Sequence, residues 1–208
     1  MTGQGSPAAV RIEGVRKTFP GRSRRAAPRR ALDGFDLQVE EGEFLCLLGP
    51  SGCGKSTLLN LLAGFSRPDS GDVLLDGNRI IGPGSERGVL FQTPMLFPWL
   101  STLDNVLYGP RARHEVTPEV RERALGLLET VGLSDAQDAY PHELSGGMRH
   151  RAAFARVLVN RPRLLLMDEP FGALDAITRV AMQRFLLYLW ERDRITIVFV
   201  THDVEEAV

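Results

Sequence analysis

Hydrophobic residues along this chain follow two patterns, short apolar runs of strand length and longer stretches with apolar residues at helical spacing. Helices are predicted after the glycine-rich segment at 49–54, between residues 117 and 132, and over 148–160 and 178–190. Because strands and helices alternate and several strands are apolar throughout, the pattern predicts an α/β fold around a parallel sheet. The predicted strands are residues 10–19, 44–48, 89–91, 163–167 and 195–200.

Two segments depart from this alternation. A hairpin is predicted over residues 72–80, with Asp76-Gly77 as its two-residue turn. From residue 93 the composition changes to closely spaced prolines, and a helix is predicted to begin after Thr117, with Pro118 in its first position. We interpret residues 93–143 as a helical subdomain inserted into a single domain, between core segments at 10–92 and 144–208.

The composition is that of a globular protein with a substantial core. The 208 residues are 43% hydrophobic, and 25 Lys and Arg oppose 26 Asp and Glu, for a formal net charge of −1. This balance argues against a nucleic-acid partner, since nucleic-acid binders are usually basic. No apolar run approaches the roughly 20 residues of a membrane span, and Cys46 and Cys53 lack metal-site spacing. Action at a membrane would therefore require a partner.

Arginines gather between residues 21 and 30, among small residues and a proline. Such a segment is typical of a mobile surface loop. We interpret it as solvated, with a site for anionic lipid or a regulator as the alternative. The arginines are Arg22, Arg24, Arg25, Arg29 and Arg30.

Residues 49–57 match the phosphate-loop pattern G-x-x-x-x-G-K-[ST], between a predicted strand and a predicted helix, as the pattern requires. Glycines let successive backbone N–H groups converge on an anion, and the following helix directs its positive end there. Lys55 adds a full charge, and the Ser56 hydroxyl is a candidate Mg²⁺ ligand. The residues expected to bind the nucleotide are Gly49, Pro50, Ser51, Gly52, Cys53, Gly54, Lys55, Ser56 and Thr57.

Two carboxylates, Asp168 and Glu169, end a predicted buried strand. Ligands of α/β sheets bind beyond the carboxyl ends of the strands. Asp168 is therefore a candidate Mg²⁺ ligand, and Glu169 a candidate for orienting and polarising an attacking water. Acidic pairs without function also occur at strand ends, but the phosphate loop favours the functional interpretation.

The segment Leu144-Ser145-Gly146-Gly147 begins a predicted helix. Ser145 is a helix-capping residue type, and the two glycines leave backbone N–H groups uncovered, so this helix start can bind an anion. An ordinary helix cap is the alternative. A single nucleotide does not need both the phosphate loop and this helix start from the same chain. A head-to-tail dimer would use both, because each chain could close the nucleotide site of the other.

These segments together resemble the ABC ATPase family over nearly the whole chain. The resemblance adds Gln92 after the third predicted core strand, Ala173-Leu174-Asp175, and His202 after the last strand. It implies a P-loop NTPase (RecA-like) cassette with an N-terminal antiparallel β subdomain and an inserted helical subdomain. It also implies a homodimer that binds two ATP molecules with Mg²⁺ and drives a transporter at the cytoplasmic face of the membrane.

The resemblance also implies residue roles. Gln92 would reach Mg²⁺ and relay to transmembrane permease subunits, and His202 would contact the γ-phosphate and act with Glu169 in hydrolysis. Asp175 would couple the two sites of the dimer, and Phe19 stands where an aromatic ring stacks on adenine. A solute-binding protein outside the cell would be an indirect partner.

Details of the sequence resemble the branch that imports nitrate, sulfonates and taurine. These are Met148, directly after the Leu-Ser-Gly-Gly segment at 144–147, and the segment 97–100, Phe-Pro-Trp-Leu. Met148 stands where the family usually continues this segment with glutamine, and His150 replaces another usual glutamine. Phe97 and Trp99 are either a docking site for the membrane subunit or part of the subdomain core.

Three other uses of this cassette fit the sequence less well. A DNA-repair or chromosome-organising ATPase would carry a long coiled coil between Lys55 and Ser145, and no sustained heptads occur there. A translation factor would have paired cassettes. The presence of Glu169 and His202 argues against a non-hydrolysing regulatory subunit. The sequence stops soon after Asp203, where a capping box predicts the start of a helix, so a C-terminally truncated cassette is expected, and this keeps the regulatory alternative open.

Overall fold

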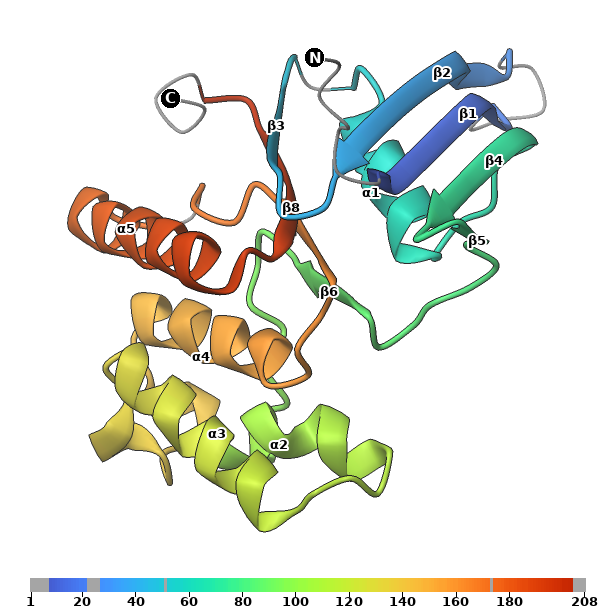
Figure 1. Ribbon diagram of the computed structural model, residues 1–208. Coiled ribbons are helices and arrows are strands. Elements are labelled where there is room, and N and C mark those ends of the chain that lie inside the picture. Colours follow the sequence, from blue (N-terminus) through green and yellow to red (C-terminus); the bar gives the residue numbers. More distant parts are fainter. Residues whose placement is uncertain (1–7, 22–26, 51, 173, 204–208) are drawn as a thin grey trace, which may run out of the picture.

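The computed structural model describes residues 8–21, 27–50, 52–172 and 174–203, which form two β-sheets and a set of helices (Figure 1). The strands are β1 Ala8–Phe19, β2 Arg29–Glu40, β3 Phe44–Leu48, β4 Ser70–Leu75, β5 Asn78–Arg79, β6 Arg87–Leu90, β7 Leu164–Asp168 and β8 Thr196–Thr201. The helices are α1 Lys55–Ala63, α2 Thr102–Ala112, α3 Pro118–Thr130, α4 Gly146–Leu158 and α5 Ala176–Asp193, with short 3-10 helices at Ser134–Ala136 and Pro141–Glu143.

A four-stranded parallel sheet, in the order β3-β8-β7-β6, forms the centre of the molecule. Alternate side chains of β7 face opposite sides of it. Leu164 and Leu166 pack with α1, whereas Leu165 and Met167 pack with α4 and α5. Because both faces are covered, the strands are apolar on both sides, and the predicted parallel α/β fold is confirmed.

A second, antiparallel sheet has the order β2-β1-β4-β5 and packs its buried face on α1. The predicted hairpin at Asp76-Gly77 is present, with Leu75 opposite Asn78. The prediction of a loop through residue 30 is wrong at its end, because β2 begins at Arg29. Pairing with β1 gives the backbone of this polar stretch its hydrogen bonds. These bonds favour a strand here, although the local composition favours a loop. Residues 22–26 lie outside the described part of the chain.

The segment between β6 and α4 is helical. Ser101 caps α2 by accepting a hydrogen bond from the Asp104 N–H, and Thr117 caps α3 in the same way. Both helices pack against α4 through a third apolar cluster. Asn105, fully buried in α2, fixes the preceding loop by bonding the backbone of residues 97, 100 and 101. The sequence did not predict α2, because its surroundings are rich in proline.

Candidate active site

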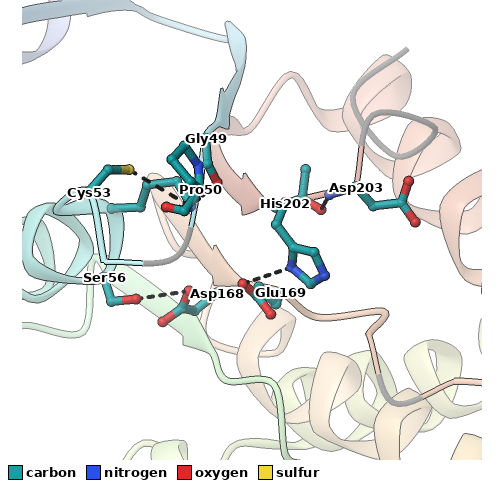
Figure 2. Close-up of polar contacts among 10 residues, drawn as sticks. Gly49, Pro50, Cys53, Ser56, Asp168, Glu169, His202 and Asp203 are labelled. Atoms are coloured by element: carbon teal, nitrogen blue, oxygen red, sulfur yellow. Dashed lines mark hydrogen bonds and ion pairs between the residues drawn. The ribbon is translucent and has the colours of Figure 1, made fainter.

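The carboxyl ends of the four parallel strands lie at one edge of the central sheet, and the candidate residues follow them. Gly49 follows β3, Gln92 comes soon after β6, Asp168 ends β7 and His202 follows β8. Figure 2 shows Ser56, Asp168, Glu169 and His202 converging from α1, β7 and the end of β8. The parallel order therefore gathers segments that are far apart in the chain.

The phosphate loop connects β3 to α1 with a backbone that only glycine adopts easily. Gly54 has φ 110°, and a Cβ there would lie 2.7 Å from the carbonyl oxygen of Ala31. No side chain caps α1, and its first turn contains no acidic residue, so its leading N–H groups are open to an anion. Ser51 lies outside the described residues.

Lys55 folds back over this loop. Its ammonium group donates hydrogen bonds to the carbonyl oxygens of Gly49 and Pro50, the latter at 3.0 Å, and lies 3.9 Å from the Cys53 sulfur. The positive charge is therefore held directly above the loop that the sequence assigned to phosphates. Cys53 is a free, exposed thiol.

Ser56 and Asp168 meet between α1 and β7, where the serine hydroxyl donates to the Asp168 carboxylate at 3.4 Å. Burial raises the pKa of Asp168, and the Glu169 charge adds to this, while the Ser56 hydrogen bond and Lys55 oppose it. A cation placed here would remove the cost of that buried charge, so the two oxygen groups suit Mg²⁺.

Gln92, the third predicted metal residue, lies at the same edge. Its amide nitrogen is 3.5 Å from the point that a Cβ on Gly172 would occupy. In the described ranges no cluster of three or more His, Cys, Asp or Glu could hold a metal ion. A cation at this edge would therefore depend on Ser56, Asp168 and the phosphates of a substrate.

Glu169 and His202 form a pair beside this position. The Glu169 carboxylate and His202 Nδ1 are 3.0 Å apart. Glu169 has φ 48°, in the left-handed region that non-glycine residues seldom adopt, and its N–H donates to the Val200 carbonyl at 2.9 Å. This backbone bond ties the end of β7 to β8, and so brings Glu169 beside the histidine that follows β8.

A cavity of about 670 Å³ opens in front of the phosphate loop. Gly52, Gly54, Lys55, Ser56, Thr57 and Glu169 line its inner part. Phe19, at the end of β1, lines its outer part; the residue is 40% exposed, and its ring centroid lies 5.6 Å from the Lys17 ammonium group. The volume lies in the usual range for small-molecule sites.

Arg29 also lines this cavity, although the sequence placed it in a solvated loop. It pairs with Phe19 across the β1–β2 ladder, and its guanidinium group donates to the Gly52 carbonyl oxygen at 2.5 Å. Strand pairing therefore brings a cation to the rim of the phosphate loop. The alternation of apolar and polar residues over 35–40 was the signal available in the sequence, but Asp33-Gly34 interrupts it before Arg29 is reached.

The residues of the second predicted anion site do not line this cavity. Ser145 caps α4 by accepting a hydrogen bond from the Met148 N–H at 3.2 Å, so the helix includes Gly146 and Gly147. A Cβ on Gly147 would lie 2.8 Å from the Thr178 side chain, so glycine allows α4 and α5 to approach.

Asp175 caps the neighbouring helix, α5. It accepts a hydrogen bond from the Thr178 N–H at 3.0 Å, and this bond lowers the pKa of its carboxyl group. Ala173, the first residue of this motif, lies outside the described part of the chain.

Of the two aromatic residues before α2, Phe97 packs against the helical segment and Trp99 is exposed. Phe97 packs on Tyr108, with ring centroids 4.2 Å apart, and lies 5.6 Å from the Arg156 guanidinium carbon. Trp99 is 70% exposed. None of the helices that the structure describes is both long and apolar enough to cross a membrane.

Comparison with known proteins places this geometry in a family. The family model described as ABC transporter matches residues 32–172. The chain is 50% identical to the nitrate import ATP-binding protein NrtD of Synechococcus elongatus over 196 residues, which cover 93% of this chain and 70% of that protein. It is 49% identical to the taurine import ATP-binding protein TauB of Chromobacterium violaceum over 201 residues, covering 97% and 75%.

A solved structure has the same fold. It is the dimeric post-hydrolysis state of the ATP-binding cassette MJ0796 with ADP and Pi bound. It superposes with a TM-score of 0.82 at 34% identity, over 95% of this chain and 90% of that one.

Proposed function

This chain belongs to the ABC transporter family as an ATP-binding cassette, and we propose that it hydrolyses ATP to energise the import of a small anion. The observation that carries the hydrolytic part is the Glu169–His202 pair, which lies beside Asp168 and the phosphate loop. The relatives named for nitrate and taurine import support the solute class, which includes sulfonates.

In this proposal the residues of the cavity divide the work of phosphoryl transfer. The phosphate loop and Lys55 bind the β- and γ-phosphates, and Phe19 stacks on the adenine ring. Ser56 and Asp168 hold Mg²⁺ with Gln92 nearby, and the ion neutralises phosphate charge when bound. Glu169 accepts a proton from the attacking water, and His202 holds the Glu169 carboxylate in position and faces the γ-phosphate.

We propose that two copies complete each site. Ser145, Gly146 and Gly147 are at an anion-binding helix start that does not line the cavity of the same chain. A head-to-tail homodimer would place this start over the nucleotide of the partner, with Asp175 at the contact between the two sites. The dimeric state of the similar MJ0796 cassette supports this arrangement.

The transport role requires further subunits. We propose that the exposed Trp99 and its neighbours dock a transmembrane permease at the cytoplasmic face, with Gln92 linking that surface to the nucleotide site. A solute-binding protein would deliver the anion from outside. Co-purification of the permease, followed by identification of the bound solute, tests this part, and a pull-down that yields only DNA or ribosomes would contradict it.

The hydrolytic role is tested by Glu169→Gln. We expect ATP turnover to fall by about 10²–10⁴-fold, the usual contribution of a general base, while calorimetry finds ATP binding retained. Lys55→Ala is the matched comparison, since it removes a phosphate-binding charge and should weaken ATP binding itself. Unchanged turnover in Glu169→Gln would refute the role of the carboxylate.

A further inference from the structure

A second cavity lies away from the nucleotide site, at the edge where β7 and β8 begin. It has a volume of about 540 Å³ and lies between α3 and the carboxyl-terminal ends of α4 and α5. Figure 1 shows these three helices stacked on the same side of the central sheet. Leu127, Leu158 and Leu189, one from each helix, contribute apolar surface to its lining. The cavity is therefore large enough for an organic molecule, with surface to contact its apolar part.

The charged groups around this cavity are unbalanced. Arg123, Arg161 and Arg192 line it together with a single carboxylate, Asp193. The Arg192 guanidinium group already binds Asp193 through two hydrogen bonds, of 2.7 and 2.6 Å. Arg161 lies close enough to lower the pKa of Asp193 further, but forms no ion pair with it among the described residues. The lining thus carries an excess of positive charge.

Arg123 lacks a partner of its own within the described part of the chain. Its Nε is shielded from solvent and makes no hydrogen bond, as is true of Nε in Arg87, Arg151 and Arg179. Those three arginines bond protein oxygens through their terminal nitrogens, whereas Arg123 makes no such bond. Burial lowers the pKa of Arg123, and the charge of Arg161 adds to this effect. An unpaired, half-buried charge beside a like charge is unfavourable unless an anion joins it.

Helix dipoles do not account for this cluster. Cations are favoured near the carboxyl-terminal ends of helices, which explains Arg192 in the last turn of α5 and Arg161 just after α4. Arg123 lies in the middle of α3, far from either end of its helix. Its position against an apolar cavity and a second arginine is better explained by a bound anion.

We propose that this cavity binds a small organic anion with an apolar body. The anionic head, a sulfonate or carboxylate, lies between Arg123 and Arg161, and the body packs on the three leucines. Two arginine side chains give such a head charge-assisted hydrogen bonds, and the leucines remove the body from water. The inference does not rest on the proposed transport function.

The test is a calorimetric titration of the full chain with 1-hexanesulfonate, which joins a sulfonate head to an apolar six-carbon body. Inorganic sulfate supplies the head alone and 1-hexanol the body alone, and both should bind more weakly. Arg123→Gln and Arg161→Gln should each weaken hexanesulfonate binding by about tenfold or more. Arg161 is exposed, so its replacement keeps the test valid if Arg123→Gln fails to fold.

Controls separate this site from other arginines and from the phosphate loop. Arg121→Gln changes an exposed arginine of α3 that does not line the cavity, and should leave hexanesulfonate affinity unchanged. Lys55→Ala should also leave it unchanged. Each of three results would overturn the proposal: no binding of hexanesulfonate, equal affinity for inorganic sulfate, or loss of binding in Lys55→Ala with retention in the Arg161→Gln variant.

Discussion

At the scale of the residue, Glu169 is held in place by its backbone. Its φ of 48° is a conformation that costs a non-glycine residue on the order of 1–3 kcal/mol. The hydrogen bond from its N–H to Val200 fixes that conformation and directs the carboxylate towards His202. Glutamine keeps this geometry and removes only the charge, so Glu169→Gln tests the chemistry separately from the backbone.

Arg29 is predicted to contribute to nucleotide binding. It lines the cavity opposite Phe19 and bonds the phosphate loop, so a bound nucleotide would lie within reach of its charge. Arg29→Gln should weaken ATP binding by about tenfold, the usual effect of losing a charge-assisted hydrogen bond. Arg30→Gln is the control, because Arg30 pairs with Asp33 outside the cavity. Equal ATP affinity of the two variants in calorimetry would refute the role of Arg29.

His150 is predicted to make stability depend on pH. It lies in α4 with 6% of its surface exposed, and burial, followed by the charge of Arg149, lowers its pKa. The unfolded chain therefore takes up a proton first as pH falls below about 6.5, and the folded state loses stability there. His150→Gln should lose less stability than the wild type between pH 7 and 5.5, in urea unfolding followed by circular dichroism. An identical pH dependence would contradict this.

The sequence was most informative where chemistry is local. The phosphate loop and the pair Asp168-Glu169 are each continuous in sequence, and their described residues lie at the predicted edge of the sheet. Their roles in binding and hydrolysis stay predictions. Arg29 could not be assigned in the same way. Its function depends on which residue it faces across a strand pair, and the local composition of 21–30 indicated only a loop.

At the scale of the element, the helix caps connect stability with the site. Ser145 caps α4 and Thr117 caps α3, each through one hydrogen bond to a backbone N–H. Replacing either by alanine should lower the free energy of unfolding by about 1 kcal/mol. Only Ser145→Ala should also weaken association of the chains in the presence of ATP. If both variants associate like the wild type, Ser145 is a structural cap and nothing more.

Helices and strands with periodic apolar residues were predicted well. Elements that depend on packing or pairing with distant parts of the chain were not. Helices α3 and α5 and strands β7 and β8 differ from prediction by only a few residues at their ends. Helix α2 was missed because Pro110 lies within it, in its last turns, where proline interrupts the expected pattern. The first residues of β2 were assigned to a loop, because they are stabilised by pairing with β1 and not by their own propensity.

At the scale of the whole molecule, one chain has two separate helix starts that we propose bind anions. The phosphate loop opens into the cavity with Glu169, whereas the start of α4 does not line that cavity. The sequence suggested a dimer from this duplication, and the structure leaves the two ends apart within one chain. The central claim of our proposal is that a second copy joins them through bound ATP.

Sedimentation velocity of the Glu169→Gln variant tests that claim most directly, because this variant is expected to bind ATP without hydrolysing it during the measurement. We predict dimers with ATP and Mg²⁺ and monomers with ADP. Gly146→Asp in the same background should prevent dimerisation, since the carboxylate would repel the phosphates. A Cβ at Gly146 meets no atom closer than 4.0 Å, and an acidic residue suits a helix start, so this variant should fold. Monomers of Glu169→Gln at saturating ATP would contradict the account.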